Sequence, residues 1–217
     1  MTTTRIVAKW GLSALAIGIL GSAALAQSQV FKFDNTPELF DASSGSRTFT
    51  VTPADMAGGT AVNRVTIAID FEKYDGGTLG VNGGDTPFYD EIVFTLTNPQ
   101  NVTTTLIGAD SFNFGADGFR GVITFDDLAS LFVNDNPDSP QAGTFKPILG
   151  ESLSALNSAD GVGDWILGIQ DTTGADHLGY YSASLEINGP TASAPEPGTL
   201  ALGLLGVGGL WLRRRRA

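Results

Sequence analysis

The chain has 217 residues, with 12 Lys and Arg, 23 Asp and Glu, one His and no Cys. The lack of cysteine excludes thiol catalysis, disulfides and Cys-based zinc sites, and a single histidine excludes metal sites built from several histidines. Between two unusual ends, residues 27–190 carry 6 basic and 22 acidic side chains, a formal charge of −16 (6 minus 22). Such a body repels nucleic acid and favours cations and cationic partners.

The first 26 residues have the pattern of a secretory signal peptide. Two basic residues precede an apolar run at residues 10–20, and small residues follow that run. Ala24 and Ala26 form the A-x-A pattern that signal peptidase reads, so cleavage is expected before Gln27. The sequence therefore predicts export through the inner membrane, with a retained N-terminal anchor as the alternative.

Residues 27–190 predict one all-β domain. Val65, Ile67 and Ile69 alternate with polar residues, and this period of two is typical of a strand with one buried face. The predicted strands are residues 29–33, 47–51, 62–71, 91–97, 103–107, 121–125, 165–170 and 181–187. About eight short strands with Gly- and Pro-rich connectors predict an antiparallel β-sandwich or jelly roll.

Helical character is confined to two short stretches of the body. Residues 126–132 predict one or two helical turns, and residues 151–156 are ambiguous. The segments 75–85 and 134–143 are rich in Gly, Pro, Asn and Asp and predict long polar loops.

Enzymatic chemistry has few candidates in this body. His177 is the one histidine that could serve a Ser-His-Asp triad, and we expect it in a loop, paired with Asp176 or with nothing. Two acidic residues at the right separation could hydrolyse a glycosidic bond, but no pair has an apolar, aromatic setting. Trp165, Tyr180 and Tyr181 could stack on sugars, although Trp165 and Tyr181 are expected on buried strand faces.

Oxygen-ligated calcium is the best chemical hypothesis from the residues alone. Calcium takes six to eight hard oxygen ligands, and acidic residues at strand ends and in loops can supply them. No segment matches an EF-hand loop, so an acidic surface that serves only solubility is the alternative. The candidate ligands are Asp90, Asp126, Asp127, Asp171 and Asp176.

The C-terminal 27 residues have three parts in a fixed order. Residues 191–198 form a linker, residues 199–212 are an uncharged apolar segment, and residues 213–217 are basic. A helix of 14 residues reaches about 21 Å, which is short for a hydrocarbon core of about 30 Å. The characteristic residues are Pro195, Glu196 and Pro197 in the linker, and Arg213, Arg214, Arg215 and Arg216 at the end.

This order resembles the PEP-CTERM sorting signal of Gram-negative bacteria. The resemblance implies a membrane-embedded exosortase as a partner, which cuts near the Pro-Glu-Pro motif. It also implies a destination at the cell surface or in the extracellular matrix. The four arginines are expected to stay in the cytoplasm. An ordinary C-terminal membrane helix is the alternative.

Two stretches of the body, residues 89–107 and 163–187, resemble the P domain. This β-barrel or jelly-roll module follows the catalytic domain of subtilisin-like proprotein convertases and many bacterial proteases. The resemblance extends over residues 62–187 and implies a jelly-roll fold and acidic positions that hold calcium in some bacterial members. The chain departs from the pattern by lacking a His after the strand at 62–71, and by having Ala183 where the family has a tryptophan.

Together these features predict a secreted, non-enzymatic structural or adhesive protein of the cell surface or extracellular matrix. The binding alternative is a lectin-like module that grips matrix polysaccharide through calcium. The enzymatic alternative is a glycosidase.

Overall fold

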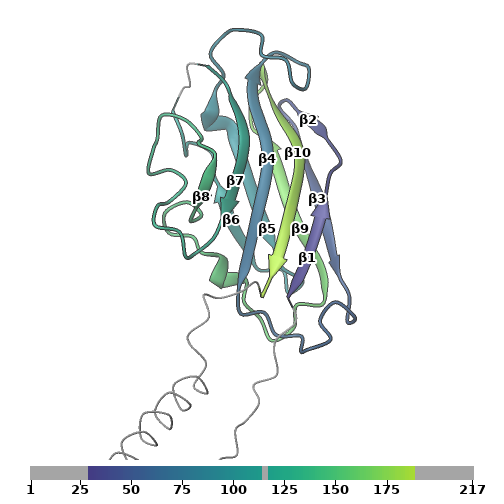
Figure 1. Cartoon of the computed structure of the whole chain (residues 1–217). Coiled ribbons are helices and arrows are strands. Elements are labelled where there is room, and N and C mark those ends of the chain that lie inside the picture. Colours follow the sequence, from purple (N-terminus) through teal and green to yellow (C-terminus); the bar gives the residue numbers. More distant parts are fainter. Residues whose placement is uncertain (1–28, 114–116, 189–217) are drawn as a thin grey trace, which may run out of the picture.

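The computed structural model describes residues 29–113 and 117–188, and no α-helix occurs among them. Two β-sheets make up the body, so the all-β prediction is confirmed. The predicted signal peptide (1–26) and tail (191–217) lie outside the described residues. The sheets face each other as two layers (Figure 1), as in a β-sandwich.

Sheet A lies in front in Figure 1 and has the order β1-β10-β4-β7-β8, with β2 also pairing with β10. The long strands β4 and β10 at its centre share the largest ladder of the fold. The strands of sheet A are β1 (Val30–Asp34), β2 (Glu38–Phe40), β4 (Val65–Asp75), β7 (Phe119–Phe125), β8 (Gly143–Phe145) and β10 (Asp176–Ile187).

Sheet B lies behind sheet A and has the order β3-β9-β5-β6. All of its pairings are antiparallel. Its strands are β3 (Ser44–Val51), β5 (Ile92–Thr97), β6 (Thr103–Ile107) and β9 (Gly163–Asp171), and two 3-10 helices, η1 (Tyr89–Glu91) and η2 (Leu153–Leu156), join the strands.

The strand pairs are nested in the order of a jelly roll. β5 pairs with β6, β4 with β7, β3 with β9 and β1 with β10, so each pair lies outside the previous one in sequence. The two strands that the sequence did not predict, β2 and β8, have only three residues each. β8 pairs with β7 in parallel, so the sheet is not wholly antiparallel as predicted.

The core lies between the two sheets and is built by the alternating residues of the strands. Ile67, Ile69 and Phe71 of β4 are fully buried, as their period of two predicts. The ring centroids of Phe71 in sheet A and Phe94 in sheet B lie 5.0 Å apart, so aromatic packing joins the layers. Trp165 is fully buried and donates its indole N–H to the carbonyl of Gly161 at 3.0 Å, which confirms the core prediction.

Tyr181 is not on the buried face, contrary to the prediction. A bulge in β10 between Tyr180 and Ser182 shifts the register by one residue. Because adjacent strand residues point to opposite faces, Tyr180 takes the buried position and Tyr181 turns outward.

The helix predicted at residues 126–132 is absent, and a turn replaces it. Asp126 closes this turn, because its side chain accepts the N–H of Leu128 and its carbonyl accepts the N–H of Ala129, both at 3.0 Å. Local side-chain bonds of this kind compete with helix formation. The ambiguous stretch 151–156 contains the 3-10 helix η2.

The start of β1, the first strand, lies beside the end of β10, the last strand. Val30 pairs with Ile187, so both ends of the body leave the same pole, at the bottom of Figure 1. At the opposite pole lie the end of β4, the Gly-rich loop after it and the turn between β9 and β10.

Candidate functional site

A buried lysine network occupies the pole opposite the chain ends. Lys73 of β4 is fully buried, and its ammonium donates to Oε2 of Glu91 at 2.8 Å and to Oδ2 of Asp171 at 2.8 Å. The third donor position is taken by the carbonyl of Asp176 at 2.6 Å. Three acceptors therefore satisfy the three N–H groups of one ammonium.

The strand register brings this network together. Lys73 follows Phe71 at the inward spacing of β4, so its side chain points into the core from sheet A. Asp171 ends β9 of sheet B and pairs with Ile92 at the start of β5, so Glu91, the last residue of η1, is brought beside Asp171. Lys73 was not among the predicted site residues, although a charged residue in an otherwise apolar i, i+2 series is a signal that the sequence offers.

Burial changes the acidity of the two carboxylates. Burial raises the pKa of Glu91 and of Asp171, and the neighbouring Lys73 opposes that rise through hydrogen bonds and charge. One ammonium thus faces two buried carboxylates, an arrangement that costs desolvation energy on both sides.

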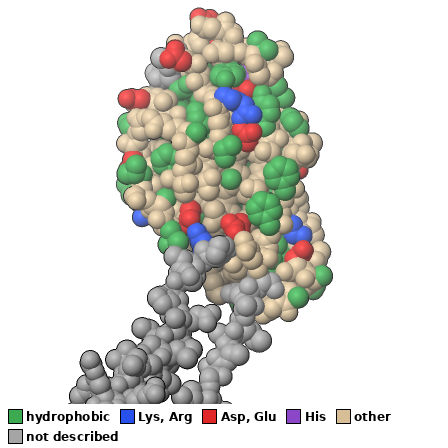
Figure 2. Space-filling model, in the orientation of Figure 1, with side chains coloured by type: hydrophobic (Ala, Val, Ile, Leu, Met, Phe, Trp, Pro, Cys, Tyr) green, Lys and Arg blue, Asp and Glu red, His purple; other side chains and the backbone are tan. Residues whose placement is uncertain are grey.

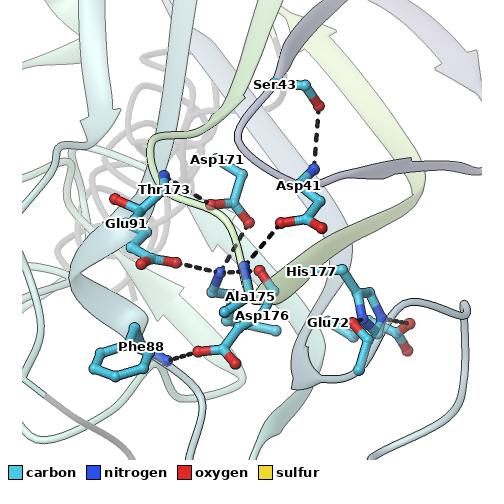
Figure 3. A network of polar contacts seen from close by, with 12 residues as sticks. Asp41, Ser43, Glu72, Phe88, Glu91, Asp171, Thr173, Ala175, Asp176 and His177 are labelled. Carbon is cyan, nitrogen blue, oxygen red and sulfur yellow. Dashed lines mark hydrogen bonds and ion pairs between the residues drawn. The ribbon is translucent and has the colours of Figure 1, made fainter.

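The turn between β9 and β10 is tied to the same network (Figure 3). The backbone N–H of Phe88 donates to Oδ2 of Asp176 at 2.6 Å, and burial raises the pKa of this carboxyl. The backbone N–H of Ala175 donates to Oδ1 of Asp41 at 3.1 Å. Ala175 has a φ of 124°, in a region that favours glycine, so these bonds hold a strained turn.

His177 is in strand β10 and fully buried, not in a loop as predicted. Its Nε2 lies 3.1 Å from Oε1 of Glu72, and its Nδ1 contacts the carbonyl of Gly76. The hydroxyl of Tyr181 donates to Oε2 of Glu72 at 2.7 Å. The expected partner Asp176 instead binds the backbone of Phe88.

Asp126 and Asp127 lie near the pole of the chain ends. Asp126 accepts a hydrogen bond from Arg64 at 2.7 Å. Asp127 accepts the N–H groups of Leu153 at 2.9 Å and Ser154 at 2.8 Å, at the start of η2. Both aspartates line a pocket of about 210 Å³ beside the start of β4.

The five predicted calcium ligands do not gather at one place. Asp171 and Asp176 belong to the lysine network, Asp126 and Asp127 lie near the other pole, and Asp90 lies in η1 with its Oδ1 buried and without a hydrogen-bond partner. Across the described ranges, no three acidic or histidine side chains are arranged to hold a metal ion. Calcium also binds backbone oxygens, so calcium binding stays a prediction.

Two exposed aromatic rings lie on the edge strand β1. Phe31 and Phe33 are 62% and 60% exposed and share the outer face of sheet A, because they are two residues apart. Figure 2 shows hydrophobic side chains on the side of this face where β1 lies. Strand periodicity at residues 29–33 was the available signal, but it does not say which face is covered.

The basic side chains of the described body are engaged locally. Figure 2 shows positive and negative groups in contact on this face of the molecule. Lys146 lies over the ring of Phe132, with its nitrogen 5.3 Å from the centroid. The remaining pairs are Lys32 with Asp55, Arg47 with Asp34 and Glu38, Arg64 with Asp126, Lys73 with Glu91 and Asp171, and Arg120 with Asp70 and Glu72.

No family model matches the chain, and no curated protein is significantly similar to it. A serine protease of Aeromonas sobria is structurally similar over 74% of this chain and 27% of its own, with 13% identity and a TM-score of 0.40. PfGH50B is similar over 74% of this chain and 22% of its own, with 16% identity and a TM-score of 0.33. The chain thus spans about a quarter of each of these proteins. None of the helices among the described residues is long and apolar enough to cross a bilayer.

Proposed function

We propose that the protein is an exported, non-enzymatic structural or adhesive component of the cell surface or extracellular matrix of a Gram-negative bacterium. In this proposal, signal peptidase removes residues 1–26, and an exosortase-type enzyme reads the Pro-Glu-Pro motif and the terminal arginines. The body between these signals is a P-domain-like jelly roll.

The observation that carries the adhesive role is the exposed pair of Phe31 and Phe33. Exposed phenylalanines cost solubility, and two such rings on one strand face mark an interaction surface. Strand β1, which carries both rings, is paired with β10 along all five of its residues at the edge of sheet A. Exposed aromatic rings suit the apolar faces of sugar rings and the side chains of other surface proteins.

The surroundings of the polar candidates support a structural role. Asp127 holds the start of η2, Asp171 binds Lys73, and His177 contacts Glu72. Each of these side chains makes contacts that stabilise the fold. This agrees with a protein that acts through its surface and not through a catalytic centre.

The adhesive role is tested with purified mature protein and the polysaccharide matrix of the producing cells. We expect the double variant Phe31→Ser/Phe33→Ser to cosediment with the matrix several-fold less than the native protein. Leu149→Ser is the matched control, because Leu149 is 72% exposed and lies away from β1. Equal cosedimentation of all three proteins, each with a normal melting curve, would contradict the proposal.

The sorting role is tested separately in cells. Replacing Arg213, Arg214, Arg215 and Arg216 by Gln removes the basic stop after the apolar segment. We expect the unprocessed form to accumulate and delivery to the surface to fall. Normal processing of this variant would show that the tail is not read as a sorting signal.

A calcium-dependent, lectin-like module is the second candidate. The two exposed rings favour it, because sugars stack on aromatic faces, and the unpartnered Oδ1 of Asp90 is an oxygen that a cation could bind. Glycan-array binding that chelator abolishes, with a melting temperature lowered by several degrees, is the expected signature. If chelator changes neither glycan binding nor the melting temperature, calcium has no role in binding or stability.

A further inference from the structure

The buried lysine network contains the groups that could form an amide bond within the protein: an amine and two carboxyl groups in contact. One amine, Lys73 Nζ, lies 2.8 Å from a carboxyl oxygen of Asp171 and 2.8 Å from a carboxyl oxygen of Glu91. The side chains of Lys73 and Asp171 are fully buried, and that of Glu91 is 9% exposed. An amine and a carboxyl held in contact in a dry site gain the rate advantage of a fixed geometry.

We propose that Lys73 and Asp171 condense to an intramolecular isopeptide bond, with Glu91 as the group that transfers the protons. Nζ of Lys73, as a neutral amine, attacks Cγ of a protonated Asp171. Glu91 accepts a proton from Nζ and delivers it to the departing hydroxyl group. A C–N bond forms, a C–O bond breaks and one water molecule leaves, so the step needs no oxidant, cofactor or second protein.

The burial of the pair favours this step over a lasting ion pair. Separated charges are costly in a site without water, and the neutral amine and carboxylic acid, which differ from the ion pair by one proton transfer, avoid that cost. The amide product carries no charge at all. It removes two charges next to Glu91, the ammonium of Lys73 and the carboxylate of Asp171, and Glu91 stays within reach of the new amide.

The geometry selects Asp171 as the acceptor rather than Asp176. Asp176 meets Lys73 through its backbone carbonyl, and its carboxylate binds the N–H of Phe88 at 2.6 Å. Glu91 contacts the same ammonium as Asp171, but its side chain, 9% exposed, is the least buried of the three, which suits a group that exchanges protons.

The bond would join the two sheets covalently. Lys73 belongs to β4 in sheet A and Asp171 to β9 in sheet B, and they are 98 residues apart in the chain. The chain has no cysteine, so this amide would supply the kind of cross-link that disulfides give to other exported domains.

The protein contains its own control pair. Lys32 and Asp55 also lie 2.7 Å apart, but their side chains are 23% and 30% exposed, and the other partner of Asp55 is the neutral Thr52. Water solvates these charges and no second carboxyl transfers protons. We expect this pair to stay ionic. A cross-link at Lys73 but not at Lys32 would show that the reaction needs burial and a proton-transfer group, and not only a short distance between amine and carboxyl.

Mass spectrometry of the folded, full chain tests the proposal. We expect the native protein to weigh one water less than its sequence. Trypsin applied after denaturation should fail to cut after Lys73, and the peptide 65–120 should be joined to the peptide that begins at Gly121, because Lys146 precedes a proline. Peptides containing Lys32 and Asp55 should be unlinked.

Three variants assign the roles. Asp171→Asn should still cross-link, with loss of ammonia instead of water, whereas Lys73→Arg should show its full mass. Glu91→Gln should remain folded and lose most of the cross-link; cross-linking at the native level would remove Glu91 from the mechanism. Full sequence mass and normal cleavage after Lys73 in the folded native protein would overturn the proposal, whatever the variants do.

Discussion

Glu72 and His177 contact each other across the β4–β10 ladder, with the histidine Nε2 3.1 Å from the glutamate Oε1 and both side chains fully buried. Glu72 also accepts hydrogen bonds from the N–H of Gly80 and the hydroxyl of Tyr181, both at 2.7 Å. This carboxylate therefore links the Gly-rich loop after β4 to β4 and β10, the two central strands of sheet A. Polar groups in such a network depend on one another, because each loss leaves a buried partner unsatisfied.

Replacing His177 by Ala should destabilise the protein strongly. The change opens a cavity and removes one hydrogen-bond partner of a buried carboxylate, so we expect a loss of about 2–4 kcal/mol in the free energy of unfolding. Urea denaturation measures this loss. His177→Gln, which keeps a donor near Glu72, should lose less. A loss below about 0.5 kcal/mol for the alanine variant would mean that the contact contributes little.

Replacing Asp127 by Ala should loosen the start of η2. The carboxylate accepts the N–H groups of Leu153 and Ser154, and loss of such a cap costs about 0.5–2 kcal/mol. A melting curve measures the effect, and Asp138→Ala, at an exposed loop position, is the control. We expect the same loss with and without chelator. A loss seen only without chelator would assign Asp127 to a cation.

Two aspartates should give opposite pH dependences. Burial raises the pKa of Asp176 above its usual 3.8, so the folded state binds more protons and stability falls as pH rises above 3.8. Hydrogen bonds from Lys32 and Thr52 lower the pKa of Asp55, so its stabilisation is present above 3.8 and is lost as pH falls below that value.

The two Asn variants test these signs through melting temperatures measured between about pH 2.5 and about pH 7, a range that covers both sides of the usual Asp pKa of 3.8, where the two effects diverge. Asp176→Asn should gain relative to the native protein as pH rises. Asp55→Asn should be least stable relative to the native protein at neutral pH and should approach it in acid. Parallel curves for the two variants would refute the sign assigned to one of them.

Gly163 should resist substitution. It has a φ of +130°, and a Cβ at this position would lie 2.9 Å from a side-chain carbon of Pro99. We expect Gly163→Ala to cost about 1–3 kcal/mol, from backbone strain and overpacking. Gly77→Ala is the matched control, because a Cβ there meets nothing within 4 Å and its φ is ordinary. Equal melting temperatures of the two variants would contradict this account.

Strand periodicity predicted the two-layer fold because each strand buries one face. It failed where the spacing changes, as in β10, where the bulge turns Tyr181 outward and buries Tyr180. Such an extra residue leaves no mark in an alternating sequence. The same period did not predict that Phe31 and Phe33 are exposed. Alternation shows that a strand has two different faces, but in the edge strand β1 it does not show which face is covered.

The lysine network was missed for a different reason. The acidic residues at strand ends and in loops were predicted to be cation ligands, whereas Lys73 supplies the positive charge from within the core. The contacts join residues up to 103 positions apart, which only the folded register brings together. The inward position of Lys73 in β4 was the one local signal.

The pairing of Val30 with Ile187 has a mechanical consequence. The exposed rings lie on β1, and the segment that leads to the predicted sorting tail leaves the end of β10. Tension between a bound partner and the tail would cross the five residue pairs of the β1–β10 ladder. The direct path runs through this short ladder, so the ladder, rather than the core between the sheets, would set the force at which the molecule yields.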